Sequence, residues 1–240
     1  GIDRELSFGA FSGGRMVGII LNSCSIYNGQ KAVFDAGTAV IPEYRGQGVF
    51  TELFKFAKQR LEKCGAERYY LEVLQQNDRA IALYKKLGFS VVREFSVLTA
   101  QASDEKAGNE KYDDVRCVGF GKFAFDQAEH CRCVSPSYEH STEILKLNPD
   151  FYDVAYTGDG DISAFCIFSK GDGRICRMGY RSMTDLECIL QYLLSVFGKI
   201  TAKNIDMNEV QILEMLYSVG FTQTAKQFEM AGTISCRQPE

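Results

Sequence analysis

The chain has 240 residues, of which 45% are hydrophobic and 24% charged, so it is expected to form one large or two small globular domains. This apolar content excludes a disordered chain, and the longest aliphatic stretch, residues 17–21, is too short to cross a membrane. The net charge of −4 argues against nucleic acid as a partner. Nine cysteines in a chain of this size favour reduced thiols and a cytoplasmic location.

The first half of the sequence has a strand-rich pattern followed by two helices. Apolar runs separated by Ser12-Gly13-Gly14 and by Tyr27-Asn28-Gly29 are typical of β-hairpins. Apolar residues then recur twice at helical spacing, and a stop signal, Gly65 or Gly88, follows each time. The pattern predicts strands at 8–11, 16–21, 32–40, 69–74 and 89–98, and helices at 50–61 and 77–87.

The second half repeats this order. Its helix-stop glycines, Gly198 and Gly220, are 22 residues apart, against 23 for Gly65 and Gly88. Such a match predicts a duplication. Strands are expected at 154–157, 162–168 and 174–180, and helices at 186–197 and 212–219. The predicted domains are 1–101 and 115–240, joined by a polar linker at 102–114.

The two predicted copies differ at their beginnings. Residues 115–153, with a helix expected after Pro136, precede the strands of the second copy, but only residues 1–7 precede those of the first. We therefore expect that the first copy has lost its opening elements or that native sequence precedes Gly1.

The most informative segment joins the predicted strand 32–40 to the helix 50–61 through two glycines. Gly46 and Gly48 let the backbone turn so that several N–H groups point into one concavity, and the helix N-terminus adds a positive dipole. Such a loop is suited to a pyrophosphate group. The alternative is a glycine-rich turn with a purely structural role.

The residues around this loop resemble the GCN5-related N-acetyltransferase family. Residues 45–49, Arg-Gly-Gln-Gly-Val, follow Val40 and Pro42 as in the acetyl-CoA loop of that family, although Phe50 stands where the pattern has a small residue. Residues 71–73, Leu-Glu-Val, and residues 83–89 resemble the second half of the motif. The resemblance covers residues 6–100 and implies an α/β fold. We expect two tandem domains, each a splayed mixed sheet flanked by helices.

The resemblance also implies how acetyl-CoA would bind as the co-substrate. Val40 would pair its backbone with the pantetheine arm, and Asn77 would reach the same arm, unless Asn77 is only a helix N-cap. The remaining candidate cofactor-binding residues surround the pyrophosphate and are Arg45, Gln47, Gly48, Phe50 and Thr51.

Two proton transfers are needed when an amine attacks a thioester. By resemblance, Tyr84 would be the general acid for the departing thiolate, and Glu72, twelve residues earlier, would be the general base. The alternatives are that Tyr84 is a core aromatic and that Glu72 is a solvated strand carboxylate. Asp35 and Glu43 are weaker competitors for the base.

The second copy lacks a glycine loop that could hold a pyrophosphate, because residues 181–185, Arg-Ser-Met-Thr-Asp, stand in its place. We expect a degenerate acetyltransferase-like domain there. His130, Cys131, Cys133 and His140 could supply metal ligands, but no second cysteine pair at finger spacing accompanies them, so no metal is expected.

The sequence therefore predicts an acetyl-CoA-dependent N-acetyltransferase that moves an acetyl group directly to a primary amine of a small molecule, a peptide or a protein. Two alternatives stay open: a non-catalytic module that binds CoA or a partner, and an aminoacyl or other acyl transferase. No membrane partner is expected, and a homodimer is left open.

Overall fold

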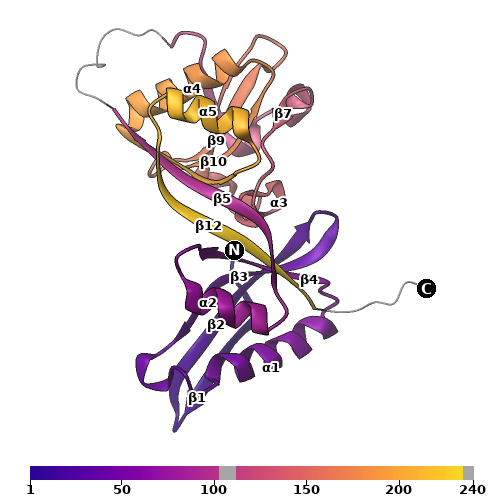
Figure 1. Ribbon diagram of the computed structural model, residues 1–240. Coiled ribbons are helices and arrows are strands. Elements are labelled where there is room, and N and C mark those ends of the chain that lie inside the picture. Colours follow the sequence, from indigo (N-terminus) through magenta and orange to yellow (C-terminus); the bar gives the residue numbers. More distant parts are fainter. Residues whose placement is uncertain (103–111, 235–240) are drawn as a thin grey trace. The chain divides into compact units, whose positions relative to one another are not determined.

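The computed structural model of the chain describes residues 1–102 and 112–234, so most of the predicted linker 102–114 lies outside the described residues. The chain forms two compact units (Figure 1). Unit 1 contains Gly1–Arg93 and the segment from Phe228 onward, whereas unit 2 contains Glu94–Gln227. This division differs from the predicted ranges 1–101 and 115–240, because residues 94–101 lie in unit 2 and the last strand of the chain ends in unit 1.

The sheet of unit 1 has the strand order β1-β2-β3-β4-β12. The first three strands form antiparallel hairpins, and β4 runs parallel to β3. The hairpin between β2 and β3 turns at Asn28 and Gly29, both at positive φ, as a two-residue turn requires. The bounds are Asp3–Ser12 for β1, Arg15–Tyr27 for β2, Gln30–Val40 for β3, Arg68–Leu74 for β4 and Thr222–Thr233 for β12.

Two helices, α1 (Val49–Lys63) and α2 (Asp78–Lys86), share one hydrophobic core with the sheet of unit 1 (Figure 1). The helices end before Gly65 and Gly88, both of which have positive φ, so the predicted stop signals are confirmed. The buried residues of α1 are those that the helical spacing selects: Phe50, Leu53, Phe54, Ala57 and Leu61.

Unit 2 is built on strands in the order β5-β11-β10-β9-β8-β6, with the first part of β12 beside β5 and with β7 paired to β10. The bounds are Ser90–Gln101 for β5, Arg116–Gly119 for β6, Arg132–Cys133 for β7, Tyr152–Thr157 for β8, Ala164–Ser169 for β9, Ile175–Tyr180 for β10 and Lys199–Asp206 for β11. Four strands of the structure, β6, β7, β11 and β12, are additions to the predicted elements.

Different elements cover the two faces of the unit 2 sheet. One core contains the buried residues of α4 (Met183–Phe197) and α5 (Val210–Ser218). The other core contains residues of the segment 120–145. In that segment the helix expected after Pro136 is only a 3-10 turn, Tyr138–His140, followed by α3 (Thr142–Leu145). Further 3-10 turns are Pro42–Tyr44, Phe120–Lys122, Phe125–Ala128 and Pro149–Phe151.

The predicted repeat is visible in the order and the length of the elements. Three strands, a helix, a strand, a helix and a closing strand follow one another in both halves. Matching helices have 15 residues (α1 and α4) or 9 residues (α2 and α5), and the closing strands β5 and β12 have 12 residues each.

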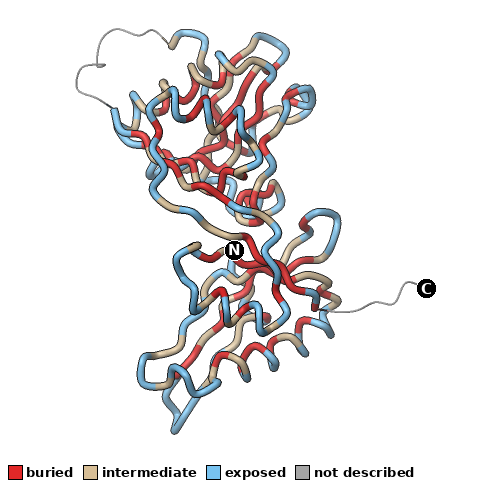
Figure 2. The backbone as a smooth tube through the Cα atoms, viewed as in Figure 1, coloured by how far each residue is buried: buried red, intermediate tan, exposed pale blue. Residues whose placement is uncertain are grey.

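Each closing strand begins in the unit of its own half and ends in the other unit. β5 leaves unit 1 after Arg93, and β12 enters it at Phe228. Figure 2 shows that buried residues follow the strands of both units. Met230 and Ile234 are both buried in the core of unit 1, so the C-terminal segment completes that core.

Candidate active site

The glycine loop lies where the sequence places it, between the end of β3 and the first turn of α1. Gly46 and Gly48 have φ of 77° and 81°, a region that favours glycine, and an added Cβ at either would meet nothing within 4 Å. The loop therefore needs these glycines for their backbone conformation rather than for space. Gly48 is the N-cap of α1 and provides no capping side chain, so the first-turn amides remain suited to an anion.

Three other predicted loop residues have defined contacts. The Nε of Arg45 donates to the carbonyl oxygen of Val40 at 2.9 Å, and the Nε2 of Gln47 donates to the carbonyl oxygen of Glu43 at 2.7 Å. A pantetheine arm that pairs with Val40 must therefore share or displace the Arg45 contact. Phe50 is buried, with its ring 5.7 Å from that of Tyr84, so its side chain packs inward and leaves the loop open.

The sheet of unit 1 opens immediately beyond Phe34. Parallel pairs join β3 and β4 at Ala32 and Arg68, at Val33 and Tyr69, and at Phe34 and Tyr70. Both strands continue past these pairs, β3 to Val40 and β4 to Leu74. The expected splay between these two strands therefore begins at Asp35.

Tyr84 reaches this opening from α2. Its hydroxyl donates to Oδ2 of Asp35 at 3.0 Å, and its ring stacks edge-on against Phe50 and Phe89. The Asp35 carboxylate also accepts from the hydroxyl of Thr38 at 2.8 Å and from the amide of Gly37 at 3.0 Å. The hydroxyl of Tyr84 is thus held at the point where β3 and β4 separate.

The surroundings raise the pKa of both Tyr84 and Asp35. Burial, and after it the charge and the hydrogen bond of Asp35, raises the pKa of Tyr84 above the ordinary value of a tyrosine. Burial also raises the pKa of Asp35, although the hydrogen bonds from Thr38, Tyr84 and Gly37 act in the opposite direction. Tyr84 is therefore protonated at neutral pH. An acceptor that enters the opening would compete with Asp35 for the hydrogen bond from the Tyr84 hydroxyl.

The structure does not bring Glu72 next to Tyr84. Along β4, Leu71 and Val73 are buried in the same core as Tyr84, and the alternation of a strand places Glu72 on the opposite face. Glu72 is half-buried. Asn77 is the N-cap of α2, where its Oδ1 accepts from the amide of Ala80 at 3.2 Å.

Asp35 is the residue whose place in the site the sequence underestimated. The sequence offered it only as a weaker candidate base, yet it is the acceptor for Tyr84. The two residues are 49 positions apart, so no local spacing links them. The available signal was a carboxylate in the middle of an otherwise apolar strand, which is rare unless the group has partners.

We expect Gly48→Val to abolish acetyl-CoA binding, with one site per chain in the unaltered protein. A β-branched residue at a φ of 81° is strained, so the loop would rearrange and its amides would turn away from the pyrophosphate. Calorimetric titration measures the affinity and the stoichiometry. Gly29→Val is a matched control, because Gly29 has a φ of 75° and open surroundings in the hairpin at the other end of β3. Tight binding by the Gly48 variant, or two sites per chain, would contradict this assignment.

The corresponding turn of unit 2 is closed by its own side chains. The hydroxyl of Ser182 caps α4 by accepting from the amide of Asp185 at 3.2 Å. The carboxylate of Asp185 accepts from the hydroxyl of Ser163 and adds a negative charge at this helix end. A pyrophosphate would find the first turn of α4 occupied and would be repelled by that charge.

The histidine and cysteine cluster does not assemble. His130 is exposed, whereas Cys131 and His140 are buried, and burial lowers the pKa of His140 to about 4. Within residues 1–102 and 112–234, no group of three His, Cys, Asp or Glu side chains is placed to hold a metal ion. None of the helices in these ranges is long and apolar enough to span a bilayer.

A mixed sheet that opens beside a glycine loop at a helix N-terminus defines the acetyltransferase class of folds. Residues 1–89 match the model of the acetyltransferase (GNAT) family.

Two curated proteins illustrate the likeness in sequence. N-alpha-acetyltransferase 30 of Schizosaccharomyces pombe is 31% identical over 86 residues, which are 35% of this chain and 57% of that protein. The ribosomal protein bS18 alanine N-acetyltransferase of Escherichia coli K12 is 32% identical over 93 residues, which are 37% and 57%. The match thus covers less than two thirds of each relative.

Two solved structures share the fold over nearly the whole chain. A GCN5-related N-acetyltransferase from Sphaerobacter thermophilus has a TM-score of 0.63 and 16% identity, covering 93% of this chain and 78% of that one. A tandem GNAT protein from the clavulanic acid biosynthesis pathway has a TM-score of 0.60 and 13% identity, covering 97% and 83%. The expected α/β fold with a mixed sheet flanked by helices is therefore confirmed.

Proposed function

We propose that the chain is an acetyl-CoA-dependent N-acetyltransferase whose reaction takes place in unit 1. The observation that carries the proposal is the position of the Tyr84 hydroxyl at the opening between β3 and β4, in the same unit as the glycine loop. A thioester laid along β3 from the loop would bring its sulfur toward that opening. The match of residues 1–89 to the acetyltransferase (GNAT) family model supports the same reaction.

In this reaction a neutral amine attacks the acetyl carbonyl, a C–N bond forms and the C–S bond breaks. Tyr84 donates its proton to the departing thiolate, and a base accepts the proton that the amine loses. We propose Glu72 as that base, acting from the face of β4 opposite to Tyr84, at the level where β3 and β4 are separated. The Tyr84 proton is held in a hydrogen bond to Asp35, whose charge also raises the pKa of Tyr84, so Asp35 sets how readily Tyr84 acts as an acid.

The pH dependence of turnover separates the two candidate bases. If Glu72 accepts the proton, Glu72→Gln lowers turnover most at low pH, where the amine is most fully protonated. Asp35→Asn removes a charge that raises the pKa of Tyr84, so it should move the alkaline limb of the profile to lower pH. The comparison is made by measuring turnover as a function of pH for both variants on one verified substrate. A low-pH loss in Asp35→Asn, with an unchanged Glu72→Gln profile, would make Asp35 the base.

The acceptor is proposed to be a primary amine on a peptide, a protein or a small molecule. Two relatives are named for the acetylation of α-amines or of a ribosomal-protein alanine, so peptides with a free N-terminal amine are the first acceptors to test. A thiol-release assay with acetyl-CoA and a panel of amines identifies the class. Binding of acetyl-CoA without transfer to any amine would favour a non-catalytic module, and transfer from another acyl donor would favour an acyltransferase of different specificity.

We propose that unit 2 derives from a degenerate copy of the same domain. The matched element lengths support a common origin, and the capped, acidic start of α4 supports the loss of pyrophosphate binding. The eight described cysteines are free thiols, in keeping with a cytoplasmic location. A homodimer and the absence of nucleic-acid partners stay predictions.

A further inference from the structure

Unit 2 contains a cavity of about 300 Å³ that the acetyltransferase chemistry does not use. It lies between the segment that carries α3 and the strands β9 and β10. Aromatic side chains, Phe125 and Phe165, form part of its wall, and two cationic side chains, Lys146 and Arg177, also line it. The volume is at the lower end of the range for small-molecule sites.

The aromatic part of the wall is held in place by its neighbours. The ring of Phe123 lies 5.3 Å from that of Phe165 and 4.8 Å from that of Phe125, so the three rings form one cluster. Gly179 of β10 leaves room for the Phe165 ring, since a Cβ on Gly179 would lie 2.3 Å from it. The apolar wall is therefore shaped before any ligand arrives.

Arg177 is a cation on the inner face of the sheet. It pairs across the strands with Ile167, which is fully buried, and directly paired residues of an antiparallel ladder share a face. Its Nη1 donates to the hydroxyl of Thr142, a neutral group. Its Nε is buried and has no hydrogen-bond partner in the described part of the chain. No carboxylate forms an ion pair with Arg177 among these residues.

A partly buried guanidinium ordinarily has a carboxylate partner, and Arg177 has none among the described residues. The Nε edge of an arginine presents two parallel N–H groups, which match the two oxygens of a carboxylate. Lys146 adds a second positive charge on the same cavity, and Glu129 is the one acidic residue in its lining. The lining therefore carries a net positive charge beside an apolar wall.

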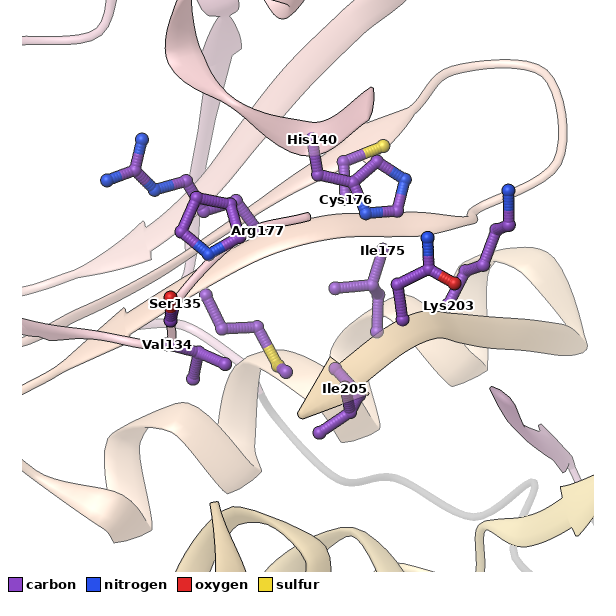
Figure 3. A pocket seen from close by; sticks show the side chains of 11 residues that line it. Val134, Ser135, His140, Ile175, Cys176, Arg177, Lys203 and Ile205 are labelled. Atoms are coloured by element: carbon purple, nitrogen blue, oxygen red, sulfur yellow. The ribbon is translucent and has the colours of Figure 1, made fainter. Parts of the chain in front are cut away.

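A second, much smaller pocket of about 10 Å³ also has Arg177 in its lining (Figure 3). It has room for about one water molecule. The Arg177 guanidinium points away from His140 and Lys203 in this view. The small pocket therefore cannot hold an organic ligand, and of these two cavities only the larger has room for one.

We propose that the cavity of unit 2 binds a small organic carboxylate, with its charged group on Arg177 and its apolar body against Phe125 and Phe165. The ligand differs from CoA, because unit 2 has no open loop for a pyrophosphate. In this way unit 2 acquires a ligand-binding role of its own. The proposal goes beyond the N-acetyltransferase function and does not depend on it.

Calorimetric titration of the full chain with 3-phenylpropanoate tests the site, and the uncharged 3-phenylpropanamide is the matched probe. We expect the acid to bind and the amide to bind at least about tenfold more weakly, because a hydrogen bond to a charged group contributes that much. Arg177→Gln should weaken binding of the acid by a similar factor. Arg174→Gln, an exposed arginine just before β10 and outside the lining, should leave it unchanged.

Three results would overturn the proposal: no binding of the acid up to about 10 mM, equal affinity for acid and amide, or unchanged affinity in Arg177→Gln. The first of these would mean that water alone satisfies Arg177. If Arg177→Gln does not fold, Lys146→Gln takes its place, since Lys146 is exposed. This variant should lower the affinity for the acid severalfold and leave the affinity for the amide unchanged. Equal binding in that variant would count against the site. All of these measurements read binding directly, so a failure of acetyl transfer would not change their meaning.

Discussion

Replacing Tyr84 by phenylalanine should lower turnover by roughly 10², the usual contribution of general acid catalysis, while the affinity for acetyl-CoA stays nearly constant. The ring would keep its edge-on contacts with Phe50 and Phe89, and Asp35 would keep its hydrogen bonds from Thr38 and Gly37. The fold should therefore survive. Steady-state kinetics on a verified amine, with calorimetry of acetyl-CoA binding, make the measurement.

Tyr69→Phe is the matched control for this change. Tyr69 lies in the same core, and its hydroxyl donates to Oδ1 of Asn22 at 2.6 Å rather than to Asp35, so its removal deletes a buried hydrogen bond in which the proposed acid has no part. We expect a loss of stability of about 1–2 kcal/mol and no comparable loss of turnover. If both variants lose turnover equally, or if Tyr84→Phe keeps near-full turnover with chemistry rate-limiting, Tyr84 is a core aromatic and not the acid.

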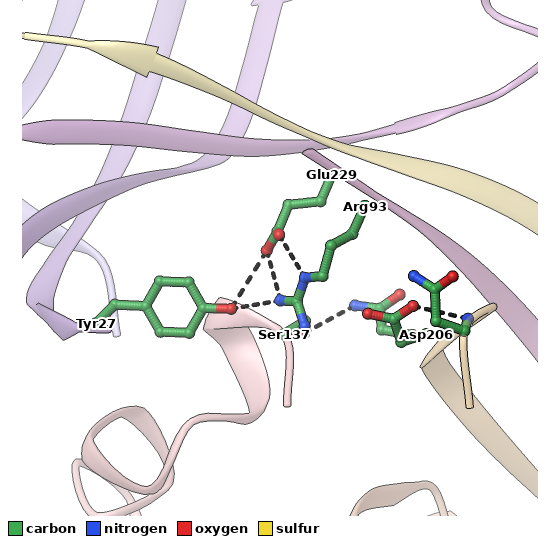
Figure 4. A network of polar contacts seen from close by, with 7 residues as sticks. Tyr27, Arg93, Ser137, Asp206 and Glu229 are labelled. Carbon is green, nitrogen blue, oxygen red and sulfur yellow. Dashed lines mark hydrogen bonds and ion pairs between the residues drawn. The ribbon is translucent and has the colours of Figure 1, made fainter. Parts of the chain in front are cut away.

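Glu229→Ala should lower the free energy of unfolding of unit 1 by about 3–5 kcal/mol. The carboxylate of Glu229 on β12 holds Arg93 through two hydrogen bonds, at 2.7 Å to Nε and 3.0 Å to Nη2, beside the hydroxyl of Tyr27 (Figure 4). Only 2% of the Glu229 side chain and 16% of the Arg93 side chain are exposed. Removal of the carboxylate takes the bidentate partner away from a mostly buried cation. Chemical denaturation followed by circular dichroism measures the change.

Two further variants make the result specific. Glu52→Ala breaks an exposed pair with Lys55 and should cost less than about 1 kcal/mol. The double variant Arg93→Met with Glu229→Leu removes both charges and should be more stable than Glu229→Ala alone. A Glu229→Ala cost no greater than that of Glu52→Ala would mean that the pair contributes little to holding β12 in unit 1.

Local features of this fold could be predicted from the sequence because they depend on neighbouring residues. The spacing of apolar residues selects the buried face of α1, and the four helix-stop glycines all adopt positive φ. The hairpin turn at Asn28 and Gly29 follows the same logic. Each of these features is decided within a few residues of chain.

The features that the sequence did not predict depend on residues far apart in the chain. The contact between Asp35 and Tyr84 joins two elements, and the pair of Arg93 and Glu229 joins residues 136 positions apart. The exchange of closing strands is decided by which sheet edge each strand meets, and both halves offer similar edges because their elements follow the same order. Apolar periodicity carries no information on that choice.

The return of β12 to unit 1 also determines when that unit can fold during synthesis. The ribosome must add residues 94–227 after Arg93 before Phe228 emerges, which takes roughly ten seconds at ordinary rates of translation. Throughout that interval the edge of β4 that pairs with β12 is open, and an open edge is a template for association with other chains. A prematurely terminated product would therefore carry the glycine loop and Tyr84 on an unfinished sheet, so the cell obtains a complete unit 1 only from a finished polypeptide.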